Sequence, residues 1–255
     1  MCELFGLSAN RPLSAGETPL IRFPPRGGQT SDNPDGWGLA WREPGDMAAG
    51  KFHLAKEPSP GWQSHLFARL AETLVSDLMV GHVRKARFPP VNSLNNTHPF
   101  RRQCCGRIWV FAHNGLVPEV VAMERDNQER YCQPKGETDS EFAFCHLLGH
   151  LHGHPAGDWL AELARISELI AWYGKFNFLL SDGDHLIAYG HDRLHYLETA
   201  GGPEQVTLIA TEPLSDNPGW TAFAPGELRI YQSGVLLERL LTHPPEPAGK
   251  PEAMP

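Results

Sequence analysis

Hydrophobic positions fall into short runs near both ends of the chain and into helical spacing in its middle. The runs at residues 78–84 and 108–113 are nearly continuous, which predicts two central buried strands. With no internal repeat, this pattern indicates one mixed α/β domain. Shorter runs between turn-forming segments predict further strands at 2–8, 36–41, 51–56, 176–182, 185–190, 206–210, 227–232 and 235–240.

Three segments carry apolar residues at helical spacing and predict helices at 61–75, 139–152 and 158–172. Residues 11–35 contain many Gly and Pro residues and predict an ordered surface loop with one helical turn. The Pro-rich end of the chain is expected to fray. We therefore expect one folded domain over residues 1–242 and a tail over 243–255.

Composition and charge exclude several classes of protein. The 255 residues are 41% hydrophobic and 20% charged, which argues against a disordered, collagen-like or coiled-coil chain. A formal net charge of −8 opposes binding to the phosphate backbone, so no nucleic acid is expected as a partner. No apolar run reaches the roughly 18–20 residues that span a bilayer, so no membrane association is expected.

The start of the chain has no basic segment followed by an apolar one, so no secretory signal is predicted. We therefore expect a cytoplasmic protein. Its cysteines are odd in number and form no regular framework, and in that compartment all are expected to be reduced thiols. They are Cys2, Cys104, Cys105, Cys132 and Cys145.

The position of Cys2 suggests chemistry. Removal of Met1, which is usual before a small second residue, leaves a thiol and a free α-amine on one residue. An α-amine titrates near pH 8, so it can act as a general base for the neighbouring thiol. On position alone, an inert cysteine at an unimportant terminus is the more frequent case.

Polar residues that follow apolar strands offer partners for such a nucleophile. Asn114 and Gly115 can direct a side-chain amide and a backbone N–H at one developing oxyanion, although Asn-Gly is also an ordinary turn. Arg84 can form a bidentate bond with a carboxylate or lie on a charged surface loop. Asp139 can hold an ammonium group, or it can cap the helix that follows, as Thr138 also can.

Together these residues resemble the class II glutamine amidotransferases, which are N-terminal nucleophile hydrolases, in their stand-alone single-domain form. The resemblance implies an α+β fold, a four-layer αββα sandwich of two antiparallel sheets, with residues 1–242 as the amidotransferase domain. Six motifs carry it, in the family's order: Met1-Cys2, Asp35-Gly36-Trp37-Gly38, Gly81-His82-Val83-Arg84, Asn96-Thr97-His98-Pro99-Phe100, His113-Asn114-Gly115 and Thr138-Asp139-Ser140-Glu141.

The resemblance also implies roles for individual residues. Cys2 attacks the side-chain amide of glutamine and forms a γ-glutamyl thioester, which water then hydrolyses. Asn114 and Gly115 form the oxyanion hole, and no cofactor is needed. Arg84 binds the substrate α-carboxylate and Asp139 its α-ammonium group. The remaining implied substrate-binding residues are His82, Trp37 and His98.

Two positions depart from the family pattern. Glu3 stands where many members have a small residue, and Arg87 stands where many have Thr. Arg87 affects the expected details of carboxylate binding, whereas neither departure affects the nucleophile. The mechanism also requires that Met1 be removed, because a peptide bond to Met1 takes away the free amine of Cys2.

Two other classes of protein compete with this hypothesis. His146 and His150 are four residues apart and could share one helical face as zinc ligands. There is no HExxH motif and no CxxC pair, so no metal site is expected. A binding module that keeps the fold and loses the chemistry is the second alternative, and the complete set of catalytic residues argues against it.

Within the enzyme hypothesis, the sequence leaves the acceptor open. The protein could be a glutaminase that passes ammonia to a separate synthase partner. Alternatively, it could hydrolyse a γ-glutamyl amide or peptide with water as the only acceptor. The same residues recognise the γ-glutamyl group of these small molecules in both cases.

Overall fold

The first strand shows how the apolar pattern builds this fold. In β1 (Glu3–Ser14), Leu4 packs into a core between two sheets, whereas Phe5 and Leu7 pack into a core on the outer face. The structure is a computed structural model and describes residues 2–45, 51–86, 92–127, 131–152, 159–199 and 202–245.

β1 lies in a seven-stranded antiparallel sheet, sheet A, whose strand order is β11-β9-β10-β1-β4-β2-β3. Two long strands, β1 and β4, form its middle, and the N-terminal part of the chain supplies one half. The other strands of sheet A are β2 (Trp37–Trp41), β3 (His53–Glu57), β4 (Val75–Val83), β9 (His195–Glu198), β10 (Val206–Ala210) and β11 (Thr221–Ala222).

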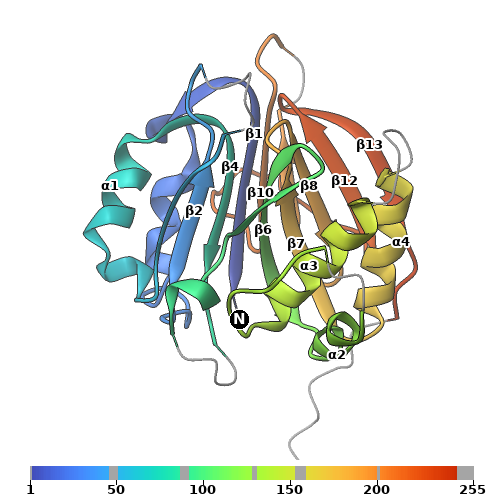
Figure 1. Cartoon of the computed structure of the whole chain (residues 1–255). Coiled ribbons are helices and arrows are strands. Elements are labelled where there is room, and N and C mark those ends of the chain that lie inside the picture. The colour runs from blue at the N-terminus through green and yellow to red at the C-terminus, as the bar shows by residue number, and fades with distance from the viewer. Residues whose placement is uncertain are drawn as a thin grey trace, which may run out of the picture.

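A six-stranded antiparallel sheet, sheet B, faces sheet A and has the order β13-β12-β8-β7-β6-β5. Its strands are β5 (Phe100–Cys104), β6 (Arg107–Leu116), β7 (Lys175–Ser181), β8 (His185–Gly190), β12 (Glu227–Gln232) and β13 (Val235–Leu241). Figure 1 shows the two sheets side by side, with helices on both outer sides.

Helices complete the four layers. The outer side of sheet A is covered by α1 (His65–Thr73) and by short 3-10 helices. Sheet B is covered by α2 (Glu119–Asp126), α3 (Asp139–His152) and α4 (Trp159–Ala171). The 3-10 helices are Ala15–Glu17, Pro19–Arg22, Pro24–Arg26, Gly61–Gln63 and Leu94–Asn96.

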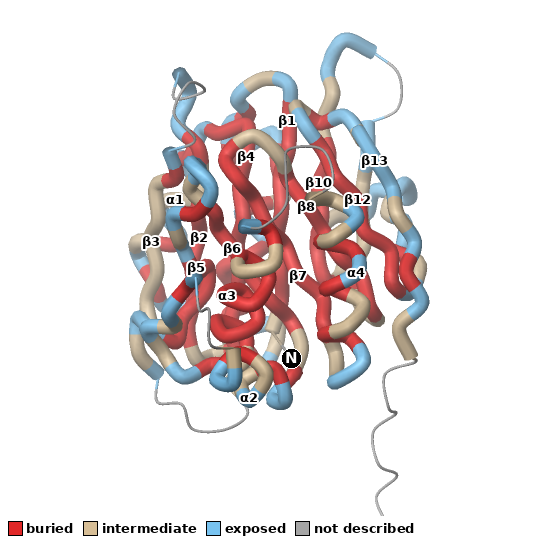
Figure 2. Tube along the Cα trace, turned by 45° about the vertical axis from the view of Figure 1, so that its right-hand side comes forward, coloured by how far each residue is buried: buried red, intermediate tan, exposed pale blue. Residues whose placement is uncertain are grey.

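Three apolar cores separate the four layers. Phe23, Trp37 and Phe67 belong to the core between sheet A and its helices. Leu4 and Val110 belong to the core between the sheets, and sheet B packs on α3 and α4 through the largest cluster. Figure 2 shows the buried strands in the interior of the molecule. The fold is therefore the expected α+β arrangement of two antiparallel sheets.

The strand register brings several chain segments to one edge of the sandwich. Cys2 directly precedes β1, and Glu3 pairs with Val83 at the end of β4. On sheet B, Asn114 lies near the end of β6 and pairs with Asn177 of β7. A hydrogen bond of 3.1 Å between His82 Nε2 and the carbonyl oxygen of His113 joins β4 to β6. The ends of three strands from both sheets thus meet where Cys2 begins the fold.

Most predicted elements are present, and the differences have physical reasons. The helix predicted at 61–75 is a 3-10 turn followed by α1, and Val75 already begins β4. Residues 11–14 extend β1, and the following loop contains three 3-10 helices instead of one helical turn. Four short elements were not predicted, because polar residues break their apolar pattern: β5, β9, β11 and α2.

The C-terminal segment is attached to sheet B at its beginning. Thr242 is buried, and its hydroxyl group lies 2.9 Å from the Tyr189 hydroxyl. His191 Nε2 lies 2.9 Å from the carbonyl oxygen of Pro245. The predicted fraying is therefore wrong for residues 243–245, and the rest of the predicted tail lies outside the described residues.

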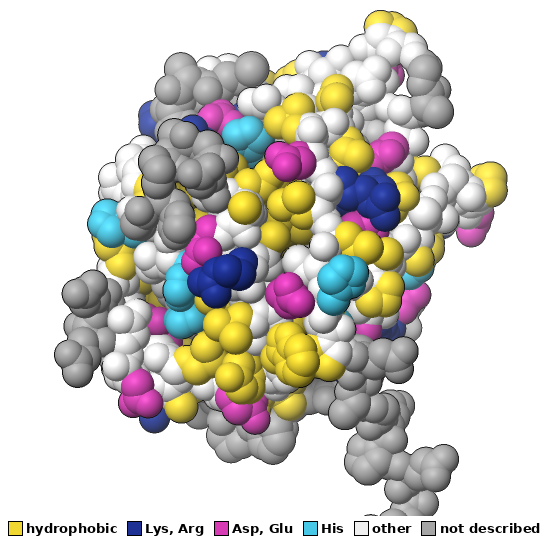
Figure 3. Space-filling view, turned by 90° about the vertical axis from the view of Figure 1, so that its right-hand side faces the viewer, with side chains coloured by type: hydrophobic (Ala, Val, Ile, Leu, Met, Phe, Trp, Pro, Cys, Tyr) yellow, Lys and Arg dark blue, Asp and Glu magenta, His cyan; other side chains and the backbone are white. Residues whose placement is uncertain are grey.

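The surface on the side of sheet B is mixed in character. Figure 3 views the molecule from this side, and apolar side chains there lie beside charged ones. Trp172 is 61% exposed and Leu237 is 52% exposed. Within the described ranges, no helix combines the length and the apolar character needed to cross a bilayer.

A buried ion pair links the two sheets. The Arg42 guanidinium donates two hydrogen bonds of 2.9 Å to the carboxylate of Asp77 and one of 2.7 Å to the carbonyl oxygen of Gly183. Asp77 lies in β4 of sheet A and Arg42 directly follows β2 of the same sheet, whereas Gly183 lies in the turn between β7 and β8 of sheet B. Both side chains are more than 90% buried, so each charge depends on the other.

Replacing Asp77 by Ala is expected to lower the free energy of unfolding by about 3–5 kcal/mol, because it leaves the buried Arg42 charge with only a half-exposed carboxylate, that of Asp184, at 4.0 Å. Urea unfolding measures this change. The matched control is Asp216→Ala, which removes an exposed partner of Arg22 at 3.7 Å and should cost less than about 1 kcal/mol. Equal losses in both variants would contradict the assigned role of the buried pair.

Candidate functional site

A cavity of about 290 Å³ opens at the edge where β1, β4 and β6 meet. Cys2, Arg84, Gly115 and Asp139 all line it, and His98 lines it as well. These five residues come from five separate motifs of the sequence. The structure therefore brings most of the predicted site residues to one hollow.

The segment after β4 holds the thiol of Cys2. The backbone N–H of Lys85 donates a hydrogen bond of 3.2 Å to Cys2 Sγ. Burial raises the pKa of this thiol, while the Lys85 N–H and the charge of Arg84 act in the opposite direction. A thiol with a raised pKa is mostly protonated at neutral pH, so nucleophilic attack requires a base that removes its proton.

A polar network braces Arg84 at the cavity. Arg84 Nη1 donates a hydrogen bond of 2.7 Å to Asn92 Oδ1. The carboxylate of Asp35 accepts a 2.8 Å bond from the backbone N–H of Ala86 and a 3.3 Å bond from Asn92 Nδ2. Because a guanidinium has five N–H donors, further donors of Arg84 can serve a substrate carboxylate. Asp35 thus positions this segment.

Asn114 does not line the cavity itself, although the neighbouring Gly115 does. Asn114 Nδ2 donates a hydrogen bond of 3.2 Å to Thr211 Oγ1, which also accepts a 3.0 Å bond from the backbone N–H of Leu4. Thr211 therefore fixes the Asn114 amide against the start of β1. An amide carries two N–H donors, and the second can donate to an oxyanion.

Asn177 supports the end of β6 from behind. Its Nδ2 donates hydrogen bonds to the carbonyl oxygen of Asn114 at 3.0 Å and to the carboxylate of Asp192 at 2.7 Å. Its Oδ1 accepts from three consecutive backbone N–H groups, those of residues 191–193. Sequence reasoning missed Thr211 and Asn177. A buried Asn within the apolar run 176–180 is the signal that could have indicated Asn177.

Gly115 is required by close packing between β6 and β7. A Cβ atom at this position would lie 1.7 Å from the carbonyl oxygen of Lys175 and 2.5 Å from His113 Nε2. Both neighbours are fixed, because the same two atoms are joined by a 3.1 Å hydrogen bond. No side chain fits here without moving the strand that carries Asn114.

We expect Gly115→Ala to lower kcat/KM for an amide substrate at least about 100-fold, because the shifted strand would misalign Asn114 and Gly115, the oxyanion donors that the sequence predicts. Overpacking should also cost about 1–3 kcal/mol of folding stability. The control is Gly149→Ala in α3, where an added Cβ meets nothing within 4 Å. That variant should keep full activity, and comparable loss of activity in both would argue against the packing explanation.

The start of α3 separates the two roles that the sequence left open for Thr138 and Asp139. Thr138 Oγ1 accepts a 3.2 Å hydrogen bond from the backbone N–H of Glu141, as an N-cap does. Asp139 accepts bonds of 2.7 Å from the N–H of Val117 and 2.9 Å from that of Ser140. Thr138 thus caps the helix, and Asp139 presents an oriented carboxylate at the cavity.

Three buried histidines lie at and behind the cavity. His98 lines it, and neither of its ring nitrogens has a hydrogen-bond partner. The His82 ring packs on His98 at 4.1 Å and does not line the cavity, whereas His113 lines it and has its Nδ1 2.8 Å from Ser140 Oγ. Burial lowers the pKa of His82 to about 3 and lowers those of His98 and His113. All three imidazoles are therefore neutral at physiological pH.

Trp37 lies away from the cavity. Its indole stacks on Phe67 of α1 at 4.2 Å in the outer core of sheet A, and Nε1 donates a 2.9 Å hydrogen bond to Glu57. The structure therefore does not place Trp37 where it could contact a substrate in this cavity. The next residue matters more for the site, because a Cβ on Gly38 would lie 2.1 Å from the carbonyl oxygen of His98.

Of the two positions that depart from the family pattern, Glu3 and Arg87, the structure describes only Glu3. Glu3 is buried and forms contacts of 3.5 Å with Arg26 and 3.4 Å with Asn33, and it does not line the Cys2 cavity. Burial raises the pKa of its carboxyl group. Arg87 and Met1 lie outside the described residues.

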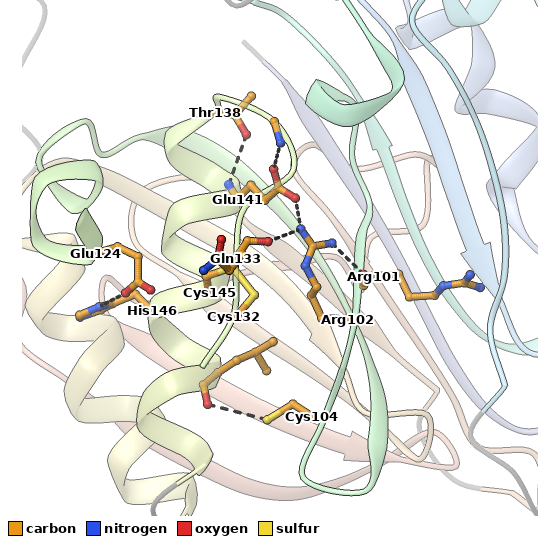
Figure 4. The surroundings of a disulfide bond; sticks show 12 residues. Arg101, Arg102, Cys104, Glu124, Cys132, Gln133, Thr138, Glu141, Cys145 and His146 are labelled. Carbon is orange, nitrogen blue, oxygen red and sulfur yellow. Dashed lines mark hydrogen bonds and ion pairs between the residues drawn. A yellow bond between two sulfur atoms is a disulfide. The ribbon is translucent and has the colours of Figure 1, made fainter. Parts of the chain in front are cut away.

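The histidines considered as zinc ligands are engaged with carboxylates. His146 Nδ1 lies 3.1 Å from Glu124, and His150 Nδ1 lies 2.9 Å from Glu162. Each imidazole has its own acidic partner, and Figure 4 shows the contact between His146 and Glu124. This arrangement explains both histidines as partners in local hydrogen bonds between helices.

The expectation of five reduced thiols is wrong for one pair. Cys132 and Cys145 form a disulfide bond that ties the segment before α3 to the helix itself (Figure 4). Their sequence pattern gave no indication of pairing, since only the fold brings their Cα atoms to 4.9 Å. Cys2, Cys104 and Cys105 are free.

Comparisons with known proteins agree with this geometry. The family model for class II glutamine amidotransferases matches residues 1–201. The Escherichia coli K12 protein YafJ, named as a glutamine amidotransferase, is 35% identical, and the match covers 92% of this chain and 98% of YafJ. A γ-glutamyl-hercynylcysteine sulfoxide hydrolase of Mycolicibacterium smegmatis is 27% identical over 74% of each chain.

Solved structures show the same fold. A crystal structure of a predicted glutamine amidotransferase from Pseudomonas aeruginosa PA01 is 33% identical with a TM-score of 0.67, covering 93% of this chain and all of that one. The phosphoribosylpyrophosphate amidotransferase of Bacillus subtilis is 18% identical with a TM-score of 0.66, covering 94% of this chain and 49% of that one. This chain therefore belongs to the class II glutamine amidotransferases.

Proposed function

We propose that the protein hydrolyses the side-chain amide of glutamine, with Cys2 as an N-terminal nucleophile. The observation that carries this proposal is the convergence of Cys2, Arg84, Gly115 and Asp139 on one cavity. Binding and cleavage of a γ-glutamyl amide require a nucleophile, a cation for the carboxylate, an anion for the ammonium group and a donor for the oxyanion, and these residues offer all four. Membership in the amidotransferase family supports an enzymatic role.

The reaction begins after Met1 has been removed. The α-amine of Cys2 takes the proton of the thiol, and Sγ attacks the δ-carbon of glutamine. The tetrahedral oxyanion accepts hydrogen bonds from the Asn114 side chain and the Gly115 backbone N–H. When the C–N bond breaks, the α-ammonium returns its proton to the leaving nitrogen, and ammonia departs from a γ-glutamyl thioester.

Water completes the cycle. The α-amine removes a proton from water, hydroxide adds to the thioester carbon, and the C–S bond breaks. Glutamate leaves, and the thiolate of Cys2 recovers its proton. The raised pKa of the Cys2 thiol makes the adjacent base necessary for the first step and disfavours free thiolate as the resting state.

Opposite charges at the cavity orient the amino-acid end of the substrate. Arg84 binds the α-carboxylate, and Asp139 binds the α-ammonium group. Two backbone N–H groups hold the Asp139 carboxylate in place, and Asn92 holds the guanidinium of Arg84. Trp37 and His82 act from behind the site by supporting Gly38 and His98, and His98 lines the pocket.

Ammonia is a neutral nucleophile at the moment of release, and we propose that a separate synthase partner consumes it in the cytoplasm. The second candidate is a hydrolase of a γ-glutamyl amide or peptide with water as the only acceptor. The similarity to the γ-glutamyl-hercynylcysteine sulfoxide hydrolase favours this candidate. Arg84 and Asp139 recognise the same γ-glutamyl end in both reactions.

Release of glutamate from glutamine and from a panel of γ-glutamyl peptides tests the proposal and separates the two candidates. The amidotransferase predicts glutamine as the substrate with the highest kcat/KM and equal amounts of ammonia and glutamate. The hydrolase hypothesis predicts a γ-glutamyl peptide whose kcat/KM exceeds that of glutamine by at least about tenfold. No turnover of any substrate by protein with a free Cys2 amine would overturn both candidates.

A further inference from the structure

A second group of reactive side chains lies outside the amide-cleaving cavity. The ligand atoms of Cys104, Cys105 and His152 all lie within 4.8 Å of one another. The two cysteines end β5 and begin its turn into β6, whereas His152 is the last residue of α3. None of the three lines the cavity of Cys2. Two thiols and an imidazole are the donor set that selects Zn²⁺ over Mg²⁺ or Ca²⁺.

The spacing of these atoms suits a tetrahedral metal ion. Zn–S bonds of about 2.3 Å and Zn–N bonds of about 2.0–2.1 Å place neighbouring ligand atoms roughly 3.5–3.8 Å apart in a tetrahedron. Cys105 Sγ lies 3.8 Å from His152 Nδ1. The three ligand atoms can therefore surround one cation after small rotations of their side chains.

Local backbone geometry places the thiols. Cys104 pairs with Arg107 across the hairpin, so Cys105 and Gly106 form a two-residue turn. Their φ angles are +56° and +77°, as in a type I′ turn, where Asn, Asp or Gly is the usual residue at the first position. A cysteine in this left-handed conformation is unusual, and it presents an exposed thiol beside the end of α3.

The remaining ligands are held by their neighbours. Cys104 is buried, and its Sγ donates a weak 3.8 Å hydrogen bond to the carbonyl oxygen of Leu148 in α3 (Figure 4). The His152 ring stacks on Tyr131 at 3.9 Å with an interplanar angle of 27°. Tyr131 thus orients the imidazole of this cluster.

We propose that Cys104, Cys105 and His152 bind one Zn²⁺ ion, with water as the fourth ligand, and that this ion fastens the β5–β6 turn to the end of α3. Binding converts both thiols to thiolates, and two protons pass to solvent. α3 spans about 21 Å from Asp139 to His152, so the site is structural and does not act on the amide bond. The ligands are two adjacent cysteines and a histidine 47 residues away, which is why the search for CxxC and HExxH motifs missed them.

The experiment uses full-length protein purified without a histidine tag, in a reductant that does not bind metals. Elemental analysis should find about one zinc per chain. Addition of Co²⁺ to chelator-treated protein should produce the thiolate-to-cobalt absorption bands, and Zn²⁺ should abolish them. Cys105→Ser and His152→Gln each remove one exposed ligand, and each should weaken Zn²⁺ binding at least about tenfold.

His150→Gln is the matched control, since it changes a histidine on the same helix that bonds to Glu162. It should retain zinc, and so should Cys2→Ala. Glutaminase activity of Cys105→Ser should remain within about twofold of that of the unaltered protein. Absence of zinc and of the cobalt bands would overturn the proposal, as would zinc binding that Cys105→Ser and His152→Gln leave unchanged. Failure of glutamine hydrolysis would leave this outcome unaffected.

Discussion

Cys2→Ala is expected to lower kcat/KM for glutamine by about 10⁴-fold or more, while the free energy of unfolding stays within about 1 kcal/mol of the unaltered protein. Loss of a nucleophile removes the covalent pathway entirely, and effects of this size are typical of such substitutions. The small effect on stability follows because Cys2 is only partly buried and its Sγ makes weak contacts with one residue, Lys85.

Ammonia release measures this effect at saturating and at limiting glutamine. Binding should be largely preserved, because in the proposed mechanism Arg84 and Asp139 make the charged contacts with the substrate. Calorimetry with glutamine tests that point. Cys105→Ala is the matched control for general thiol loss, since Cys105 is exposed and outside the cavity. If Cys2→Ala retained more than a few per cent of the activity, the N-terminal nucleophile mechanism would be wrong.

The second large effect concerns stability in mild acid. His82, His98 and His113 are buried, and burial lowers the pKa of each, to about 3 for His82. In the unfolded chain these histidines titrate near pH 6.5. Below that pH the unfolded state binds protons that the native state does not bind. Stability is therefore complete above about pH 6.5 and falls as the pH decreases toward the native pKa values.

One histidine contributes at most about 1.4 kcal/mol per pH unit, where it is protonated in the unfolded state and neutral in the native state, so the slope of the three together is at most about 4 kcal/mol per pH unit. Urea unfolding between pH 7.5 and pH 5 measures this slope, above the range in which carboxylates dominate. His98→Asn removes one titrating group. The number of protons taken up on unfolding, which sets the slope, should therefore fall by up to about one, whatever the effect of the substitution on absolute stability. An unchanged slope in that variant would show that His98 takes up its proton in the native state.

These histidines also connect stability with the site. His82 Nε2 bonds to the backbone of β6, and His98 lines the cavity with two unpartnered ring nitrogens. A neutral imidazole can donate and accept one hydrogen bond. Acid that protonates these three histidines therefore acts at the place where β4 leads into Arg84 and β6 carries Asn114 and Gly115.

Sequence pattern was most reliable where one periodicity extended over a whole element. The spacing of Phe142, Cys145, Leu148 and Leu151 predicts a helix at 139–152, and α3 has those bounds. Strand β5 was not predicted, because its middle contains the polar residues Arg101 and Arg102. It is an edge strand of sheet B, and exposed and buried positions alternate in it only weakly. Helix α2 has eight residues, too few to establish a clear period.

The sequence by itself determined which family this protein resembles, through the order and chemistry of Cys2, Arg84, Asn114-Gly115 and Asp139. Those features are local, since each motif must carry its own reactive group. Tertiary structure decided which of them share a cavity, placed Trp37 and His82 behind it, and added Thr211, Asn177 and Asp35 as supports. It also paired Cys132 with Cys145 and brought Cys104 and Cys105 to His152. These contacts join residues far apart in the sequence, and strand register and helix packing alone fix such distances.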